Sequence, residues 1–213
     1  MVIKTYNKKN KIDCFIPCRK NGDFLKNLNF LKIDQIQLVE HTIINSINSK
    51  LFGNIYLITN DKKSFLKLKR KFPFLKLIYT SSTKQPFYKI IEKLNKKKYF
   101  REKINICVLL PNYPFKSDTT IRKIYNKYNF LKLDLIMSAI KENTFYYEKK
   151  KNKAVSINFS PRIRIKKKIP PIIKLSGGIF VYSSEKRKLD LKKIDFKNLH
   201  FINNHESFGI YSL

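Results

Sequence analysis

The sequence contains few of the residues that cross-link a chain through disulfides or bind metal ions. It has three cysteines and three histidines, and neither set has the spacing of a metal site. Cys14 and Cys107 lie within apolar runs, where a free thiol acts as a small hydrophobic side chain. We therefore expect neither a disulfide framework nor a zinc site.

Long apolar runs are also missing. None approaches the roughly 20 residues that cross a bilayer, and the basic N-terminus lacks the apolar region of a signal peptide. We therefore expect a cytoplasmic protein that does not associate with membranes. A length of 213 residues with 43% hydrophobic residues predicts one globular domain with a substantial core.

Acidic residues are scarce, and 46 basic against 15 acidic residues give a net charge of +31. Such a surplus is typical of proteins that bind nucleic acids or anionic membranes. Only seven of the 46 are arginines, however, and readers of nucleic acids favour arginine. The lysines are spread along the chain, as an AT-rich genome would produce. Nucleic-acid binding is therefore the less favoured interpretation of the charge.

Apolar, β-branched runs alternate with amphipathic segments along the first 140 residues. Strands are predicted at 12–17, 55–59, 75–79, 104–110 and 133–140. Helices are predicted at 35–50, 62–72, 85–98 and 117–129, the last with Ser117 as its N-cap. This alternation predicts an α/β fold with a mostly parallel central sheet covered on both faces.

The pattern changes after residue 141. Residues 143–169 are basic and weakly alternating, which predicts hairpins or an extended arm rather than another strand–helix unit. A strand follows behind a double glycine at 176–184, and a short one is predicted at 199–203. Since no linker or repeat divides the sequence, we expect residues 1–213 to form a single domain with an inserted arm.

The segment CFIPCRKNGDFLKN (residues 14–27) places basic residues directly after the first strand. In open α/β sheets, ligands bind at the carboxyl ends of the strands. Gly22 would let backbone N–H groups approach a phosphate, and Arg19 and Lys26 would neutralise its charge. The segment has neither a Walker A nor a GxGxxG pattern. These residues alone therefore leave open both a phosphate-binding loop and a solvated basic turn.

Five segments, in the same order along the chain, resemble the acylneuraminate cytidylyltransferases, the CMP-sialic acid synthetase family. They are IPCRKNGDFLKN, QLVEHTIINSINSKLFGNIYLITND, VLLPNYPFKS, LDLIMSAI and IPPIIKLSGGIFVY. Together they span about residues 12–210, so the resemblance is more specific than any one segment.

The resemblance implies a single nucleotide-binding domain with a nucleotide-diphospho-sugar transferase-like fold. It implies transfer of CMP from CTP to a sialic-acid-like, nine-carbon acidic sugar for surface glycan synthesis, with Mg²⁺ as cofactor. It also implies a homodimer in which residues 143–169 are the dimerisation arm.

The resemblance also implies site residues. Arg19 and Lys26 would meet the triphosphate as catalytic residues, and Arg162 and Arg164 would meet the sugar carboxylate, unless they belong to a solvated arm. The remaining nucleotide-binding positions would be Asn21, Gly22, Asn27, Pro111 and Asn112.

The sequence departs from the family pattern at three places. Lys20–Asp23 replaces the Gly-Gly-Ser-Lys centre of the phosphate loop, and Leu110 replaces a glutamine. Phe201 and Asn203 stand where the family has two metal-binding aspartates, which leaves Asn203, Glu206 and Asp61 as weak metal candidates. An alternative is therefore a non-catalytic homologue that keeps the fold and nucleotide binding. A basic RNA-binding protein is a third interpretation, supported by charge alone.

Overall fold

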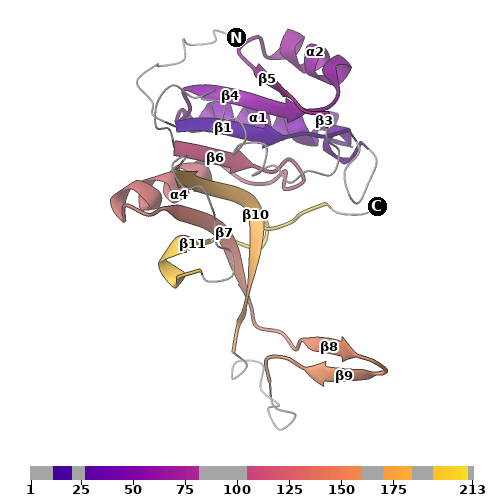
Figure 1. Ribbon diagram of the computed structural model, residues 1–213, viewed down its shortest axis with the longest axis vertical. Helices are drawn as coiled ribbons and strands as arrows, with labels where there is room; N and C mark the ends of the chain where they lie inside the picture. Colours follow the sequence, from indigo (N-terminus) through magenta and orange to yellow (C-terminus); the bar gives the residue numbers. More distant parts are fainter. Residues whose placement is uncertain (1–11, 21–26, 82–104, 160–169, 184–193, 211–213) are drawn as a thin grey trace.

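The computed structural model describes residues 12–20, 27–81, 105–159, 170–183 and 194–210. Its centre is a seven-stranded sheet (Figure 1). Across the sheet the strands are β11 (Leu199–Phe201), β7 (Leu135–Glu142), β10 (Ile172–Ser183), β6 (Asn105–Leu109), β1 (Ile12–Pro17), β4 (Asn54–Thr59) and β5 (Lys76–Tyr79).

The sheet is mostly parallel, as the sequence predicted. β1 pairs in parallel with β4 and β6, β4 with β5, and β11 with β7. Only β10 is antiparallel to its two neighbours in this sheet. The first five residues of β1 are all buried, because both faces of a parallel sheet are covered. This explains why β1 is apolar apart from Asp13.

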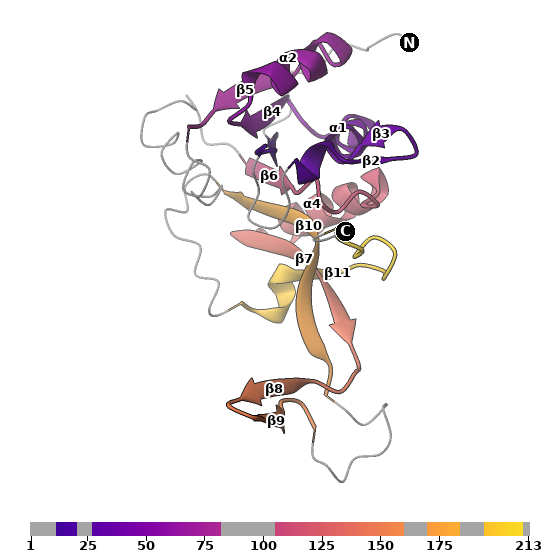
Figure 2. The ribbon, with the colours of Figure 1, turned by 90° about the vertical axis from the view of Figure 1, so that its right-hand side faces the viewer.

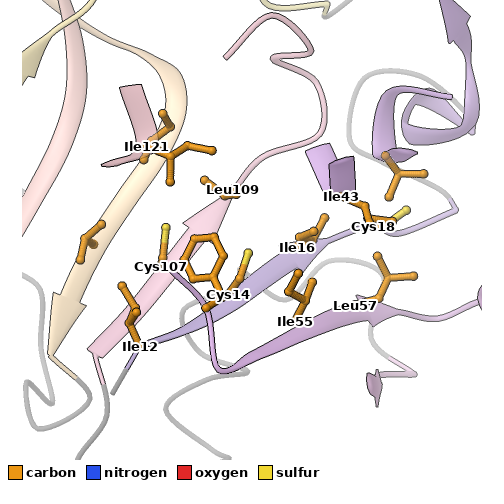
Figure 3. Packing of buried hydrophobic residues seen from close by; sticks show 14 of the residues in the cluster. Ile12, Cys14, Ile16, Cys18, Ile43, Ile55, Leu57, Cys107, Leu109 and Ile121 are labelled. Atoms are coloured by element: carbon orange, nitrogen blue, oxygen red, sulfur yellow. The ribbon is translucent and has the colours of Figure 1, made fainter. Parts of the chain in front are cut away.

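Three described helices pack against one hydrophobic cluster on the sheet: α1 (Leu38–Ser49), α2 (Lys62–Lys71) and α4 (Asp118–Phe130). Figure 3 shows Ile43 of α1 beside Ile16 of β1, and Ile121 of α4 beside Leu109 of β6. Phe15, which lies between Cys14 and Ile16 in β1, belongs to a second buried cluster, because successive side chains of a strand point to opposite faces. None of the described helices is long and apolar enough to cross a membrane.

An arm projects from the sheet, as predicted for the segment after residue 142. β7 and β10 pair as far as Glu142 and Ile172, and a hairpin of β8 (Tyr147–Lys150) and β9 (Lys153–Ser156) lies beyond them (Figures 1 and 2). Residues 160–169 of the expected arm lie outside the described residues.

Two strand and helix boundaries differ from the predicted ones. β10 begins at Ile172, so Gly177 and Gly178 lie inside it, at a bulge between Leu175 and Phe180. Both glycines have a positive φ, of 79° and 62°, which residues with a side chain rarely adopt. The double glycine therefore lies at a bend within a strand that continues from the arm into the sheet. The prediction that it precedes the strand was wrong.

The first helix begins later than predicted. Residues 32–37 instead form a small hairpin of β2 (Lys32–Ile33) and β3 (Ile36–Gln37). Asp34 and Gln35 have positive φ values, as a tight hairpin turn requires. Short 3₁₀ helices occur at η1 (Leu28–Phe30) and η3 (Phe196–Asn198). The helix predicted at 85–98 lies outside the described residues.

Candidate functional site

The loops that follow β1, β4, β6 and β7 lie at one edge of the sheet, because these strands are parallel to one another. In open α/β sheets this carboxyl edge is where ligands bind. The segment after β11, residues 202–210, begins at the same edge because β11 is parallel to β7. The candidate site is therefore built from these loops.

Two hydrogen bonds, one between backbone groups and one from a side chain, join the two ends of the loop after β1. The N–H of Asn27 donates to the carbonyl of Lys20 (2.7 Å), and Asn29 Nδ2 donates to the carbonyl of Arg19 (3.1 Å). Asn27 has a left-handed φ of 59° at the start of η1. The structure thus brings Arg19 and Asn27 together at the carboxyl edge. Asn21, Gly22 and Lys26, also predicted there, lie outside the described residues.

This loop is joined to the loop after β4. The N–H of Lys20 donates to Asn60 Oδ1 (2.9 Å), and its ammonium lies 3.6 Å from Asp61 Oδ2. The N–H of Cys18 donates to the carbonyl of Ile58 (2.8 Å), which extends the pairing of β1 and β4. These contacts fix the positions of Cys18 and Lys20 relative to the end of β4 and the loop that follows it.

The loop after β6 contains the two predicted nucleotide-binding residues Pro111, which is buried, and Asn112, which is partly exposed. The N–H of Leu110 donates to the carbonyl of Gly178 (2.8 Å). A Cβ atom at Gly178 would lie 2.6 Å from the Tyr113 ring and 2.8 Å from Leu110 Cβ. The glycine is therefore required for this loop to lie against β10.

Lys116 anchors the same loop from inside the core. Its side chain is 1% exposed, and its ammonium donates to Thr42 Oγ1 (3.1 Å) and to the carbonyl of Tyr113. Asn45 Nδ2 of α1 donates to the Lys116 carbonyl (2.7 Å). Burial lowers the pKa of Lys116 to about 7. The sequence identified Lys116 only as a match to a family segment, because a lysine in this basic chain is expected on the surface.

The side chains of the three metal candidates already accept hydrogen bonds from backbone N–H or hydroxyl groups. Asp61 is the N-cap of α2: it accepts from the N–H groups of Lys63 and Ser64 and from the Ser64 hydroxyl (2.7 Å). The hydrogen bond from the Ser64 hydroxyl is the main cause that lowers the Asp61 pKa. Asn203 Oδ1 accepts from the N–H of Glu206 (2.8 Å).

Glu206 accepts from the N–H of Ser117 (3.0 Å) and from the Ser117 hydroxyl (2.6 Å) at the start of α4. Among the described residues, no group of three or more histidine, cysteine or acidic side chains could hold a metal ion. Asp61 and Glu206, the two candidate carboxylates, each accept hydrogen bonds at the start of a helix, and the Mg²⁺ implied by the family resemblance stays a prediction.

A pocket of about 320 Å³ lies where the arm leaves the domain. Its walls come from the end of β7 and from the turn after β11; they are Ile140, Lys141, Glu142, Asn143, Thr144, Asn204 and Ser207. Sequence reasoning did not find this pocket, because its two walls are about 60 residues apart. Arg162 and Arg164, predicted to bind the sugar, lie outside the described residues.

Solved structures with the same fold are known, although no protein-family model and no curated protein matches the sequence. A 4-diphosphocytidyl-2C-methyl-D-erythritol synthase is similar over 96% of this chain and 94% of its own (TM-score 0.66, 10% identity). The enzyme of that name from Anaerococcus prevotii aligns over 95% and 91% (TM-score 0.64, 13% identity).

A third similar structure is a CMP:2-keto-3-deoxy-manno-octonic acid synthetase complexed with CTP. It covers 84% of this chain and 76% of its own, with a TM-score of 0.61 and 13% identity. The fold is that of the nucleotide-diphospho-sugar transferases. At these identities the likeness establishes the fold and leaves the reaction to be argued from the site.

Proposed function

We propose that this protein is a cytidylyltransferase, which transfers CMP from CTP to a sialic-acid-like acidic sugar in the cytoplasm. One observation carries the proposal: a polar pocket lies at the same sheet edge as the loops after β1 and β6. A bimolecular transfer needs two binding sites close together, and we assign the loops after β1 and β6 to the nucleotide and the pocket to the acceptor sugar.

The nucleotide half of the site comprises Arg19, Asn27 and Asn112, and the sequence adds Asn21, Gly22, Lys26 and Pro111. Arg19 and Lys26 would neutralise the triphosphate while an acceptor hydroxyl attacks the α-phosphorus. The bond between the α- and β-phosphates then breaks, and pyrophosphate leaves as the hydroxyl proton is lost to solvent. Fixed cations stabilise the charge that moves onto pyrophosphate.

The acceptor half is the pocket at the base of the arm. Its amide and hydroxyl side chains suit a ligand with many hydroxyl groups. The Glu142 carboxylate also lines the pocket and lies 3.5 Å from the Lys174 ammonium, which offsets its charge. The ammonium of Lys141 lies 4.6 Å from the centre of the Phe201 ring, which fixes a cation beside the pocket. That cation suits the carboxylate of an acidic sugar, with Arg162 and Arg164 as further candidates. We route no step through Mg²⁺.

The test is to combine CTP and MgCl₂ with each of four acids: sialic, legionaminic, pseudaminic and 3-deoxy-manno-octulosonic acid. We expect one of them to give a CMP-sugar by mass spectrometry with equimolar pyrophosphate. UTP and ATP serve as matched nucleotide controls and should give no product. Failure of all four acids would contradict the proposed acceptor class.

A second candidate function is nucleotide binding without turnover. The hydrogen bonds of Asp61 and Glu206 favour it, because they engage at the starts of helices carboxylate oxygens that a metal ion would use. Calorimetry with CTP separates the two candidates. Tight CTP binding without any CMP-sugar supports the binding protein, and no CTP binding contradicts both.

We also propose that the arm joins two copies of the chain. Every residue of β8 is exposed, including Tyr147 at 58%, and Ile157 beyond β9 is equally exposed. Two-stranded hairpins are marginally stable in water without further burial. A second copy would cover this apolar surface, in line with the homodimer that the sequence resemblance implies.

A further inference from the structure

Glu206 joins two parts of the candidate site that are far apart in sequence. Glu206 is 7% exposed, and its carboxylate accepts hydrogen bonds from Ser117, which lies 89 positions earlier in the sequence. One oxygen accepts from both the N–H and the hydroxyl of Ser117. Ser117 Oγ in turn accepts from the N–H of Thr120 (3.1 Å), so the carboxylate completes the N-cap of α4.

The turn that carries Glu206 is itself held to the sheet. The N–H of Ile202 donates to the carbonyl of Ala139 (3.0 Å), and the Ser176 hydroxyl donates to the carbonyl of Ser207 (2.8 Å). Within the turn, Asn203 accepts from the N–H groups of Glu206 and Ser207. The backbone position of Glu206 is therefore fixed by the sheet, and its side chain contacts α4 from that position.

The same turn touches both halves of the site. Asn204 and Ser207, on either side of Glu206, line the pocket at the base of the arm. Three residues later, the N–H of Ile210 donates to the carbonyl of Asn112 (2.8 Å) in the loop after β6. The ring of His205 lies 4.8 Å from that of Phe115 in the same loop.

We propose that Glu206 is a positioning residue, which sets the distance between the acceptor pocket and the loop that meets the nucleotide. The kinetic part of this inference rests on the proposed function; the geometric part does not. Burial raises the pKa of Glu206, but hydrogen bonds from Ser117 and Thr120, with His205 nearby, leave it below its ordinary value. The carboxylate is thus ionised when it caps α4.

One consequence concerns phosphate binding. A helix N-terminus attracts anions, and α4 begins at the carboxyl edge of the sheet directly after the loop that contains Asn112. Because the Glu206 carboxylate occupies this N-terminus, a phosphate there would meet a like charge. This agrees with the proposal that the triphosphate binds at the loop after β1.

The test compares Glu206→Ala and Glu206→Gln with the wild-type protein by hydrogen exchange, without ligands. We expect exchange at the amides of Ser117, Thr120 and Ile210 to rise about tenfold or more in Glu206→Ala, since charge-assisted hydrogen bonds are lost. Glu206→Gln keeps an acceptor oxygen and should show a smaller rise. Glu148→Gln, on the exposed hairpin, is the matched control and should change none of them.

Two exchange results would overturn the inference. Unchanged exchange at the three amides would show that Glu206 holds nothing in place. An equal rise throughout β1 and β4 would show general destabilisation and no positioning role.

The kinetic readout is the KM for the acidic sugar, which should rise about tenfold in Glu206→Ala. We expect kcat to change much less. An unchanged sugar KM would also overturn the positioning role. If the wild-type protein forms no CMP-sugar at all, the proposed function fails, and the exchange results alone decide the geometric part.

Discussion

The ammonium of Lys116 lies 3.1 Å from Thr42 Oγ1, inside a core that also holds Cys14 and Cys107. This contact joins the loop after β6 to α1 from beneath the candidate site. Both thiols have a pKa above the ordinary value because they are buried, and the nearby ammonium partly offsets that rise. Cys14 of β1 and Cys107 of β6 are partners in the register of the two strands, and both are labelled in Figure 3.

Lys116 should make stability rise with pH. Its pKa is about 7 in the folded protein, against an ordinary value of 10.5, so the unfolded chain binds more protons between these values. Above pH 10.5 Lys116 is neutral in both the folded and the unfolded protein, so its burial does not lower the free energy of unfolding. As the pH falls towards 7, the unfolded chain binds the proton first and the free energy of unfolding decreases. We expect the free energy of unfolding of the wild-type protein to gain about 1.4 kcal/mol per pH unit relative to Lys116→Met.

Urea unfolding between pH 7.5 and 9 measures this difference. The comparison stays below the ordinary thiol pKa of 9.0, because above it the unfolded cysteines ionise and stability falls. Lys149→Met, on the exposed hairpin, is the control for loss of one charge. Parallel pH profiles of wild type and Lys116→Met would show that Lys116 is not buried as described.

The fold was largely predictable because its strands are buried on both faces. Runs such as residues 12–17 and 104–110 are apolar except for Asp13 and Asn105, and they marked β1 and β6 to within one residue. The beginning of β10 was missed for a physical reason. Its first residues, 172–175, precede a double glycine that resembles a turn in sequence, whereas in the structure these glycines form a bulge within the strand.

The site was less predictable because its important contacts are long-range. Position in the order of strands was enough to place Arg19, Asn27 and Asn112 at one edge. It did not reveal that Glu206 caps a helix that begins 89 positions earlier. Asp61 was predicted only as a metal candidate, although an aspartate directly before a predicted helix is a local N-cap pattern.

Replacing the Asp61 cap should destabilise the protein. We expect Asp61→Ala to lower the free energy of unfolding by about 1 kcal/mol, because the first N–H groups of α2 lose their acceptor. The ion pair with Lys20 adds little, since the Lys20 side chain is half exposed. Asp61→Asn keeps the cap and is the matched control in urea unfolding. Equal losses in both variants would contradict the capping role.

Gly178 should not tolerate a side chain. In Gly178→Ala the new Cβ would overlap Tyr113 and Leu110, and φ is +62°. We expect a loss of at least about 2 kcal/mol, from left-handed strain and overpacking together. Lys174→Ala, at an exposed position of the same strand, should cost under about 1 kcal/mol. Thermal unfolding measures both, and a neutral Gly178→Ala would show that the loop is not held against β10.

The apolar face of the arm should control assembly. We expect Tyr147→Ser with Ile157→Ser to shift the proposed dimer to monomer, because both side chains are exposed in the single chain. Sedimentation at about 0.3 M salt limits repulsion between highly charged copies. Leu66→Ser, exposed on α2, is the control and should not change assembly. A wild-type monomer at tens of micromolar would contradict the dimer.

Arg19 should contribute to CTP affinity more than any lysine of the hairpin. It leaves β1 at the carboxyl edge, and its carbonyl is held by Asn29, so its backbone position is fixed. Loss of a charged hydrogen bond to phosphate costs about 1.5–3 kcal/mol, which corresponds to about tenfold or more in affinity. Calorimetry with CTP should therefore show at least a tenfold weaker Kd for Arg19→Ala, whereas Lys149→Ala removes the same charge far from the edge and should leave it unchanged. Equal weakening by both variants would mean that CTP responds to the net charge of the protein and not to a site.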